Sequence, residues 1–125
     1  GTGRSPAGMK DSRIPDYLAH MLEAATLACT YVEGLDRNTF AQDKKTQQAV
    51  ILNLILIGEE ATKIFKDHEA FALQHAHIPW RAMKGMRNRI AHGYFEINLD
   101  VVWETVQTAL PALKVQLAAL APSQG

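Results

Sequence analysis

Apolar residues recur at helical spacing along most of the chain, and no stretch alternates apolar and polar residues as a half-buried strand does. Pro15 suits the first turn of a helix, and Gly34 suits the residue that stops it. Between them, positions three or four apart form one apolar stripe: Leu18, Met21, Leu22, Ala25 and Cys29. The segment 35–42 contains the turn formers Asp36 and Asn38, so we predict a loop there.

The most hydrophobic segment predicts a long helix from Asp43, its N-cap, to about Asp67. Apolar residues cover most of its circumference: Val50, Ile51, Leu52, Leu54, Ile55, Leu56, Ile57, Ala61, Ile64 and Phe65. Such a helix is buried on nearly all sides. In so short a chain it is either the centre of a bundle or shared with a partner chain. Gly58 costs about 1 kcal/mol in helix propensity, which a close approach of another helix would explain.

The rest of the chain predicts three further helical segments. A short one covers about 69–75, and a second runs from Pro79 to about Ala91, with Gly93 as its stop. The last starts after Asn98 or Asp100 and should be kinked near Pro111. Four main helices, a short one and brief connections predict an all-α fold, an antiparallel up-and-down helical bundle.

Length and composition indicate one ordinary globular domain, since 47% of the residues are hydrophobic and 21% are charged. We interpret residues 1–8 as the remnant of an expression tag, 9–121 as the domain and 122–125 as a frayed tail. One cysteine, Cys29, excludes an internal disulfide and is expected to be a buried structural thiol. The longest apolar run, 49–57, is too short to span a bilayer and no signal peptide is visible, so we expect a cytoplasmic location.

Positive charge is local, although 13 basic and 13 acidic residues give a net charge of zero. No acidic residue lies between Glu69 and Glu96, where the basic and titratable groups gather: His75, His77, Arg81, Lys84, Arg87, Arg89 and His92. The guanidinium of Arg87 is shaped to grip a phosphate, and the imidazole of His92 can take and give a proton near neutral pH. Together they could cut a phosphodiester without a metal. On the spacing alone, a structural salt bridge and a capping histidine are the better interpretation.

The five-residue step from Arg87 to His92 turns an ideal helix about 140° beyond one full turn, so the two side chains should diverge. Either Gly93 lets the backbone turn at His92, or the residues of two chains converge across a dimer seam. In such a cleft His92 would take the proton of a ribose 2′-OH, and the second His92 would protonate the departing 5′ oxygen. Arg87 would hold the phosphate. DNA lacks the 2′-OH and would not be cleaved. Arg81, Lys84 and Arg89 would contact RNA phosphates without regard to sequence.

The segment from Ile78-Pro79-Trp80 to Tyr94-Phe95 resembles the HepT toxins, a branch of the HEPN superfamily, through Met86-Arg87-Asn88 and His92-Gly93-Tyr94. The resemblance implies an all-helical homodimer acting as a metal-independent ribonuclease in a toxin–antitoxin pair. It makes Arg87 and His92 the catalytic pair and places Asn88 in the same polar motif. It also implies an MNT-type nucleotidyltransferase antitoxin, which adds AMP to Tyr94 and so obstructs Arg87. Gly93 departs from the larger or acidic residue common at that position.

Two other functions stay open. The bundle could be the non-catalytic substrate-binding or regulatory subunit of a nucleotidyltransferase, with Arg87 and His92 holding a nucleotide phosphate, or it could be a dimeric scaffold. We expect no metal site and no cofactor, because His75 and His77 are a loop pair without a third ligand. Glu59 and its neighbour Glu60 do not face each other on a helix, so Glu59 is expected to support the cleft or the seam.

Overall fold

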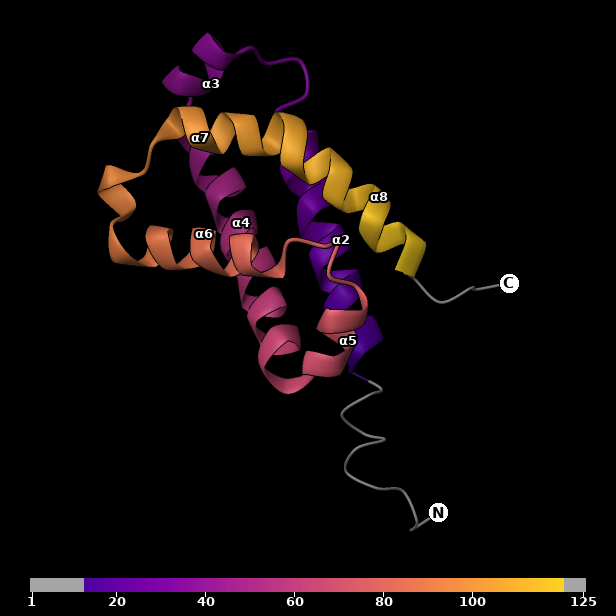
Figure 1. Cartoon of the computed structure of the whole chain (residues 1–125). Coiled ribbons are helices and arrows are strands. Elements are labelled where there is room, and N and C mark those ends of the chain that lie inside the picture. The colour runs from indigo at the N-terminus through magenta and orange to yellow at the C-terminus, as the bar shows by residue number, and fades with distance from the viewer. Residues whose placement is uncertain (1–12, 121–125) are drawn as a thin grey trace.

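The computed structural model describes residues 13–120, and that part of the chain is all-helical (Figure 1). Its long helices are α2 (Ile14–Tyr31), α4 (Lys44–Asp67), α6 (Trp80–His92) and α8 (Leu110–Leu120). The shorter elements are α3 (Arg37–Gln42), α5 (Glu69–Gln74), the 3₁₀ turn η1 (Tyr94–Glu96), α7 (Leu99–Glu104) and the π-helical turn η2 (Thr105–Ala109). The predicted all-α class is confirmed. The predicted tag (1–8) and tail (122–125) lie outside the described residues, as do residues 9–12 and 121 of the predicted domain.

The core is built by α2, α4 and α8. Helix α4 packs against both α2 and α6, and α8 packs against α2. Met21, Val50 and Leu117, one from each of the three helices, are almost wholly buried. Each such side chain contributes about 1.5–3 kcal/mol on burial. The thiol of Cys29 is partly buried in this core, where desolvation raises its pKa, in keeping with a structural role.

Two aspartates are the N-caps of helices: Asp43 caps α4 and Asp36 caps α3. Asp43 accepts from the backbone N–H of Thr46 at 3.0 Å and from its hydroxyl at 2.6 Å, which confirms the predicted start of α4. Asp36 accepts from the N–H of Thr39 at 2.8 Å and starts α3. The predicted loop over 35–42 is therefore wrong. The reason is that a turn former can equally cap a helix, and Phe40 anchors this one in the core.

The predicted break near Pro111 is present, but it lies in the turn before the proline. The carbonyl of Gln107, four residues before Pro111, falls within the π-helical turn η2. A proline ring clashes with that carbonyl and offers it no N–H, so the helix widens there. The rod made by α7, η2 and α8 bends at this region in Figure 1.

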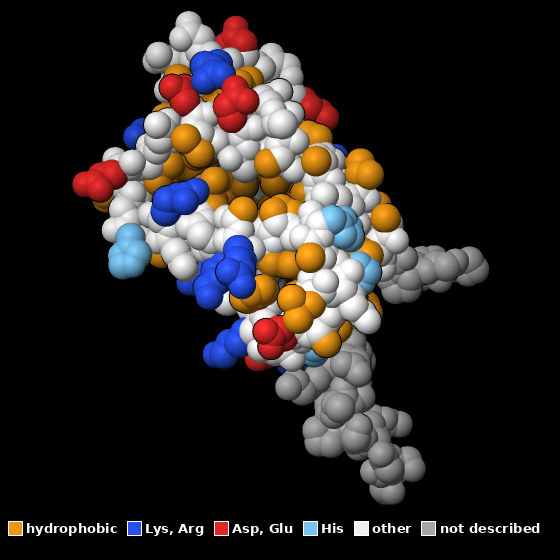
Figure 2. All heavy atoms as spheres, viewed as in Figure 1, with side chains coloured by type: hydrophobic (Ala, Val, Ile, Leu, Met, Phe, Trp, Pro, Cys, Tyr) orange, Lys and Arg blue, Asp and Glu red, His pale blue; other side chains and the backbone are white. Residues whose placement is uncertain are grey.

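The described long helices pack in the order α6, α4, α2, α8, and α2 runs antiparallel to α4 (Figure 1). Between α6 and the η2–α8 segment lies an apolar cavity of about 170 Å³, lined by Leu54, Met83 and Leu113 among others. Figure 2 shows this region as a hydrophobic hollow. The up-and-down order of all four helices stays a prediction. No helix within residues 13–120 is long and apolar enough to cross a membrane.

Candidate functional site

Helix α6 carries the motif and is anchored at its start by Trp80. The indole is buried, and its N–H donates to the carbonyls of Ala72 at 3.2 Å and His75 at 3.1 Å. These bonds tie the end of α5 to the start of α6. They give Trp80 the anchoring role expected of a buried indole, whose N–H needs a partner.

Gly58 brings α4 and α6 into direct backbone contact. A Cβ atom at position 58 would lie 2.4 Å from the Cβ of Arg87 and 2.8 Å from the carbonyl oxygen of Met83. No side chain larger than hydrogen fits there without moving a helix. The predicted close approach at Gly58 is confirmed, and it holds the backbone of Arg87 against α4.

The guanidinium of Arg87 lies along α4 with incomplete polar contacts. Its Nη2 donates to the hydroxyl of Thr62 at 3.5 Å, and Nε is 3.6 Å from a carboxylate oxygen of Glu59. The Thr62 hydroxyl donates in turn to the carbonyl of Gly58 at 2.7 Å. The buried Nε has no hydrogen-bond acceptor within the described part of the chain. A buried N–H without an acceptor is costly, so this cation is suited to gain an anion.

His92 points away from this contact. Helix α6 continues through His92, and its C-cap is Gly93, whose N–H donates to the backbone carbonyl of Arg89 at 3.1 Å. The predicted end near Ala91 with Gly93 as the stop is confirmed, and the alternative in which the chain turns at His92 is not observed. Among the described residues Arg87 and His92 share no hydrogen bond, because the unbroken helix directs them to different sides.

His92 lines a cavity of about 450 Å³ at the C-terminal end of α6. Asn88, one helical turn earlier, lines the same cavity, as do Arg89 from α6 and residues of the η1–α7 segment. Arg87 does not. The structure therefore groups Asn88 with His92 and separates both from Arg87.

Tyr94 and Phe95 form an exposed aromatic pair in η1. The two rings meet edge to face with centroids 5.3 Å apart, and 38% of Tyr94 and 97% of Phe95 are exposed. The side chain of Tyr94 is therefore open to solvent two residues beyond His92.

The three arginine and lysine residues expected to contact phosphates lie on α6. Lys84 and Arg89 are exposed, and the guanidinium of Arg81 stacks 5.2 Å from the ring centroid of Phe65. None of the three forms an ion pair within residues 13–120. Figure 2 shows basic side chains along α6 beside the hydrophobic hollow. His75 and His77 lie nearby with ring centroids 6.0 Å apart, and no three potential metal ligands gather among the described residues.

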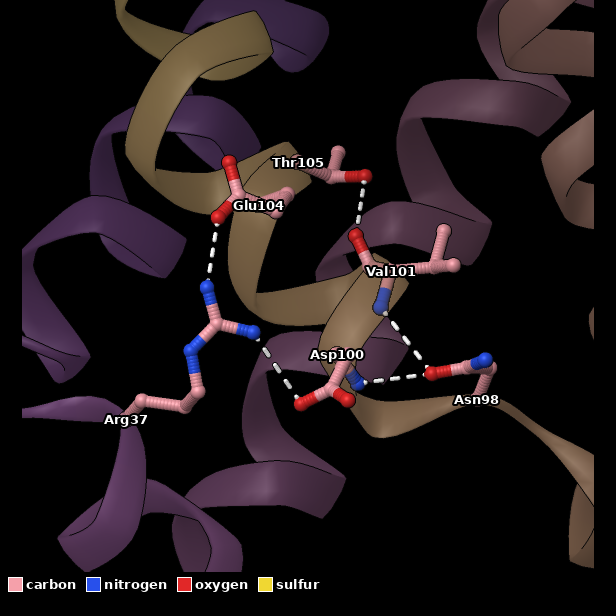
Figure 3. Close-up of polar contacts among 6 residues, drawn as sticks. All are labelled: Arg37, Asn98, Asp100, Val101, Glu104 and Thr105. Carbon is pink, nitrogen blue, oxygen red and sulfur yellow. Dashed lines mark hydrogen bonds and ion pairs between the residues drawn. The ribbon is translucent and has the colours of Figure 1, made fainter.

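A polar network holds α7 (Figure 3). Val101 and Val102 of α7 line the cavity beside His92. Arg37 donates to Asp100 at 3.1 Å and to Glu104 at 2.7 Å, and the bond to Asp100 raises the pKa of Arg37. The side-chain oxygen of Asn98 accepts from the N–H groups of Asp100 and Val101 at 2.9 and 3.2 Å. Of the two predicted starts, after Asn98 or after Asp100, the structure shows the one after Asn98.

Sequence reasoning missed the contact between Thr62 and Arg87 and the contribution of η1 and α7 to the cavity. The position of Thr62, four residues after Gly58, was the available signal, because residues four apart share a helix face.

Comparison with known proteins gives a consistent family. A family model described as Ribonuclease HepT-like matches residues 21–120. The chain is 40% identical over 99 residues to "Probable ribonuclease HepT" of Thermococcus cleftensis, covering 79% of this chain and 87% of that protein. It is 31% identical over 101 residues to "Putative RNase TTE0752" of Caldanaerobacter subterraneus subsp. tengcongensis, covering 81% and 88%. No solved structure matches the chain.

Proposed function

Because the chain belongs to the Ribonuclease HepT-like family, we propose that it is a metal-independent endoribonuclease whose cleft is built by two copies of the chain. The names of its relatives support a ribonuclease of the HEPN type. The observation that supports a two-chain cleft is that Arg87 and His92 lie apart within one chain. Arg87 lies against α4, while His92 lines the cavity beyond the end of α6.

An exposed stripe on α4 supports a seam between two copies. Leu52 and Leu56 of α4 are 55% and 45% exposed, although large apolar side chains are usually buried. With Glu59 they follow one another at spacings of four and three along one helix face. Since Glu59 is the residue beside Arg87, a partner packed on this stripe would end next to the guanidinium. A two-fold axis there would bring two arginines and two histidines together.

The reaction follows from these side chains. A neutral His92 takes the proton of a ribose 2′-OH, and that oxygen attacks the adjacent phosphorus. The bond from phosphorus to the 5′ oxygen breaks, and the protonated His92 of the second copy gives that oxygen a proton. The products carry a 2′,3′-cyclic phosphate and a 5′-hydroxyl. Positioned acid–base groups typically contribute about 10²–10⁴-fold, and a fixed donor such as Arg87 contributes about 10²–10³-fold.

Regulation by an antitoxin is part of the proposal. Tyr94 is exposed and lies two residues from His92, so an MNT-type nucleotidyltransferase could transfer AMP to its hydroxyl. The added phosphate would place an anion beside the cleft and compete with RNA for Arg87.

Cleavage of a fluorescent RNA in EDTA tests the enzyme. Wild type should cut it, whereas Arg87→Ala and His92→Ala should each lose at least about 100-fold in rate. Lys45→Ala is the control, because it removes an exposed cation near the start of α4 that belongs to neither the motif nor the cavity, and it should cut RNA at about the wild-type rate. Circular dichroism checks that each variant is folded. If wild type leaves RNA intact, or if both alanine variants cut it normally, the proposal fails.

The non-catalytic alternative gains support from the cavity beside His92, whose volume of about 450 Å³ is that of a small-ligand site. In this alternative the chain binds a nucleotide for a nucleotidyltransferase. Calorimetry with AMP and ATP distinguishes the two functions: tight nucleotide binding by a protein that leaves RNA intact would favour the alternative.

A further inference from the structure

The cavity at the end of α6 combines apolar walls with a few polar groups. Ile90, Ile97 and Val102 are among its apolar walls, and its volume is about 450 Å³. The polar side chains that line it are Asn88, Arg89, His92, Glu96 and Asn98. Sites for small molecules have this make-up, in which apolar surfaces hold a flat ligand and a few polar groups select it.

Asn98 can only donate into this cavity. Its side-chain oxygen is occupied by the N–H groups of Asp100 and Val101, and only an oxygen can accept from two N–H groups (Figure 3). The cap therefore settles which end of the amide is which. The NH₂ group, with its two donors, makes no hydrogen bond within the described residues.

Glu96 supplies a carboxylate to the same cavity. One of its oxygens lies 3.2 Å from the place where a Cβ of residue 93 would stand, so the side chain is folded back over Gly93. A carboxylate only accepts hydrogen bonds. Glu96 forms no ion pair within residues 13–120, so its oxygens are free for a ligand. Arg89 lines the same cavity, and its positive charge offsets the repulsion between the Glu96 carboxylate and an RNA strand.

We propose that this cavity binds a guanine base of the RNA strand, next to the phosphate that His92 addresses. This rests on the proposed ribonuclease function. Guanine presents two neighbouring donors, N1–H and N2–H, which match the two oxygens of the Glu96 carboxylate. It also presents the acceptor O6, which matches the amide of Asn98. The apolar walls pack on the faces of the ring, and bases of single-stranded RNA are free to be bound this way.

Fluorescence anisotropy with uncleavable strands tests the pocket. The probes are 2′-O-methyluridine nonamers with one central guanosine, inosine or adenosine, all 2′-O-methylated so that no 2′-OH can attack. Inosine lacks only the N2 amino group of guanosine. Wild type should bind the guanosine strand about tenfold more tightly than either of the others, the discrimination expected of one bidentate contact.

Two nearly isosteric variants separate base reading from folding. Glu96→Gln replaces a carboxylate oxygen with a donor, and Asn98→Asp keeps the capping oxygen but replaces the donor with an acceptor. Each should reduce the guanosine preference to within about twofold. Glu69→Gln, which makes the same charge change as Glu96→Gln at an exposed residue of α5, is the control and should keep the preference. The preference is a ratio between strands, so a general change in affinity caused by charge cancels.

The proposed guanine site is refuted if the wild-type protein shows no preference for guanosine. That result is expected if a second copy of the chain fills the cavity. Preference that survives unchanged in both Glu96→Gln and Asn98→Asp also refutes it. Because the strands cannot be cut, the result is independent of catalysis. A protein that prefers guanosine but cuts no RNA in EDTA would refute the ribonuclease function and support the guanine pocket. A protein that cuts RNA but shows no base preference would support the ribonuclease function and refute the pocket.

Discussion

Gly58→Ala should loosen the α4–α6 contact that holds Arg87. The new methyl group would stand 2.4 Å from the Cβ of Arg87 and 2.8 Å from the carbonyl oxygen of Met83. Neither neighbour is the end of a flexible side chain, so α6 itself must move. Overpacking of this kind costs about 3 kcal/mol, at the upper end of the usual range. Alanine returns about 1 kcal/mol in helix propensity. The net loss should be about 2 kcal/mol, or roughly 10 °C in melting temperature.

Gly85→Ala is the matched control. Gly85 lies in α6, and a Cβ there would meet no atom within 4 Å. The same substitution should therefore gain about 0.5–1 kcal/mol and raise the melting temperature. Thermal unfolding followed by circular dichroism, at one protein concentration because association shifts the midpoint, gives both values. An unchanged melting temperature in Gly58→Ala, or a loss in Gly85→Ala as large as that in Gly58→Ala, would refute the reasoning.

Three further predictions concern pH, assembly and regulation. The hydrogen bonds from Thr46 lower the pKa of Asp43, so this carboxylate stabilises the fold above pH about 3.9 and the contribution is lost as pH falls through its lower folded value. Asp43→Asn keeps the cap and should flatten the dependence of melting temperature on pH between 2 and 5, whereas an equal slope in both proteins would contradict this. Light scattering should give twice the 13.8 kDa of one chain for wild type. Leu52→Glu should give a monomer. Val115→Glu on α8, where the side chain is 71% exposed, is the control and should stay a dimer. If Leu52→Glu is still a dimer, α4 is not part of the seam. Tyr94→Phe should cut RNA at the wild-type rate and escape inhibition by an MNT-type nucleotidyltransferase with ATP, and inhibition of Tyr94→Phe would show that the hydroxyl is not the target.

The helices were largely predictable because each long one carries an apolar stripe at helical period. Asp43 marked the start of α4, and Asn98 was one of two predicted starts for the segment that begins with α7, since a side-chain oxygen at an N-cap accepts from the first free N–H groups. Helix α3 was not predictable from local signals. Asp36 is equally suited to open a turn or to cap a helix, and Phe40 holds this helix in the core by packing on Trp103, far along the chain, with ring centroids 5.4 Å apart.

The motif residues of the candidate site were predictable, and their surroundings only in part. The divergence of Arg87 and His92 follows from the rotation per residue of a helix, provided that the helix is unbroken. The register of α6 on α4 sets the contact of Arg87 with Thr62, and that depends on tertiary packing. The cavity beside His92 depends on how η1 and α7 fold back, which no local pattern in the sequence reports.

The ends of the RNA products test the central claim most directly. An RNA cut by the wild-type protein in EDTA should yield fragments with a 2′,3′-cyclic phosphate and a 5′-hydroxyl, identified by mass spectrometry. The same RNA with 2′-O-methyl groups throughout should stay whole. Fragments with a 3′-hydroxyl and a 5′-phosphate, or cleavage that survives 2′-O-methylation, would contradict attack by the 2′-OH under the control of Arg87 and His92.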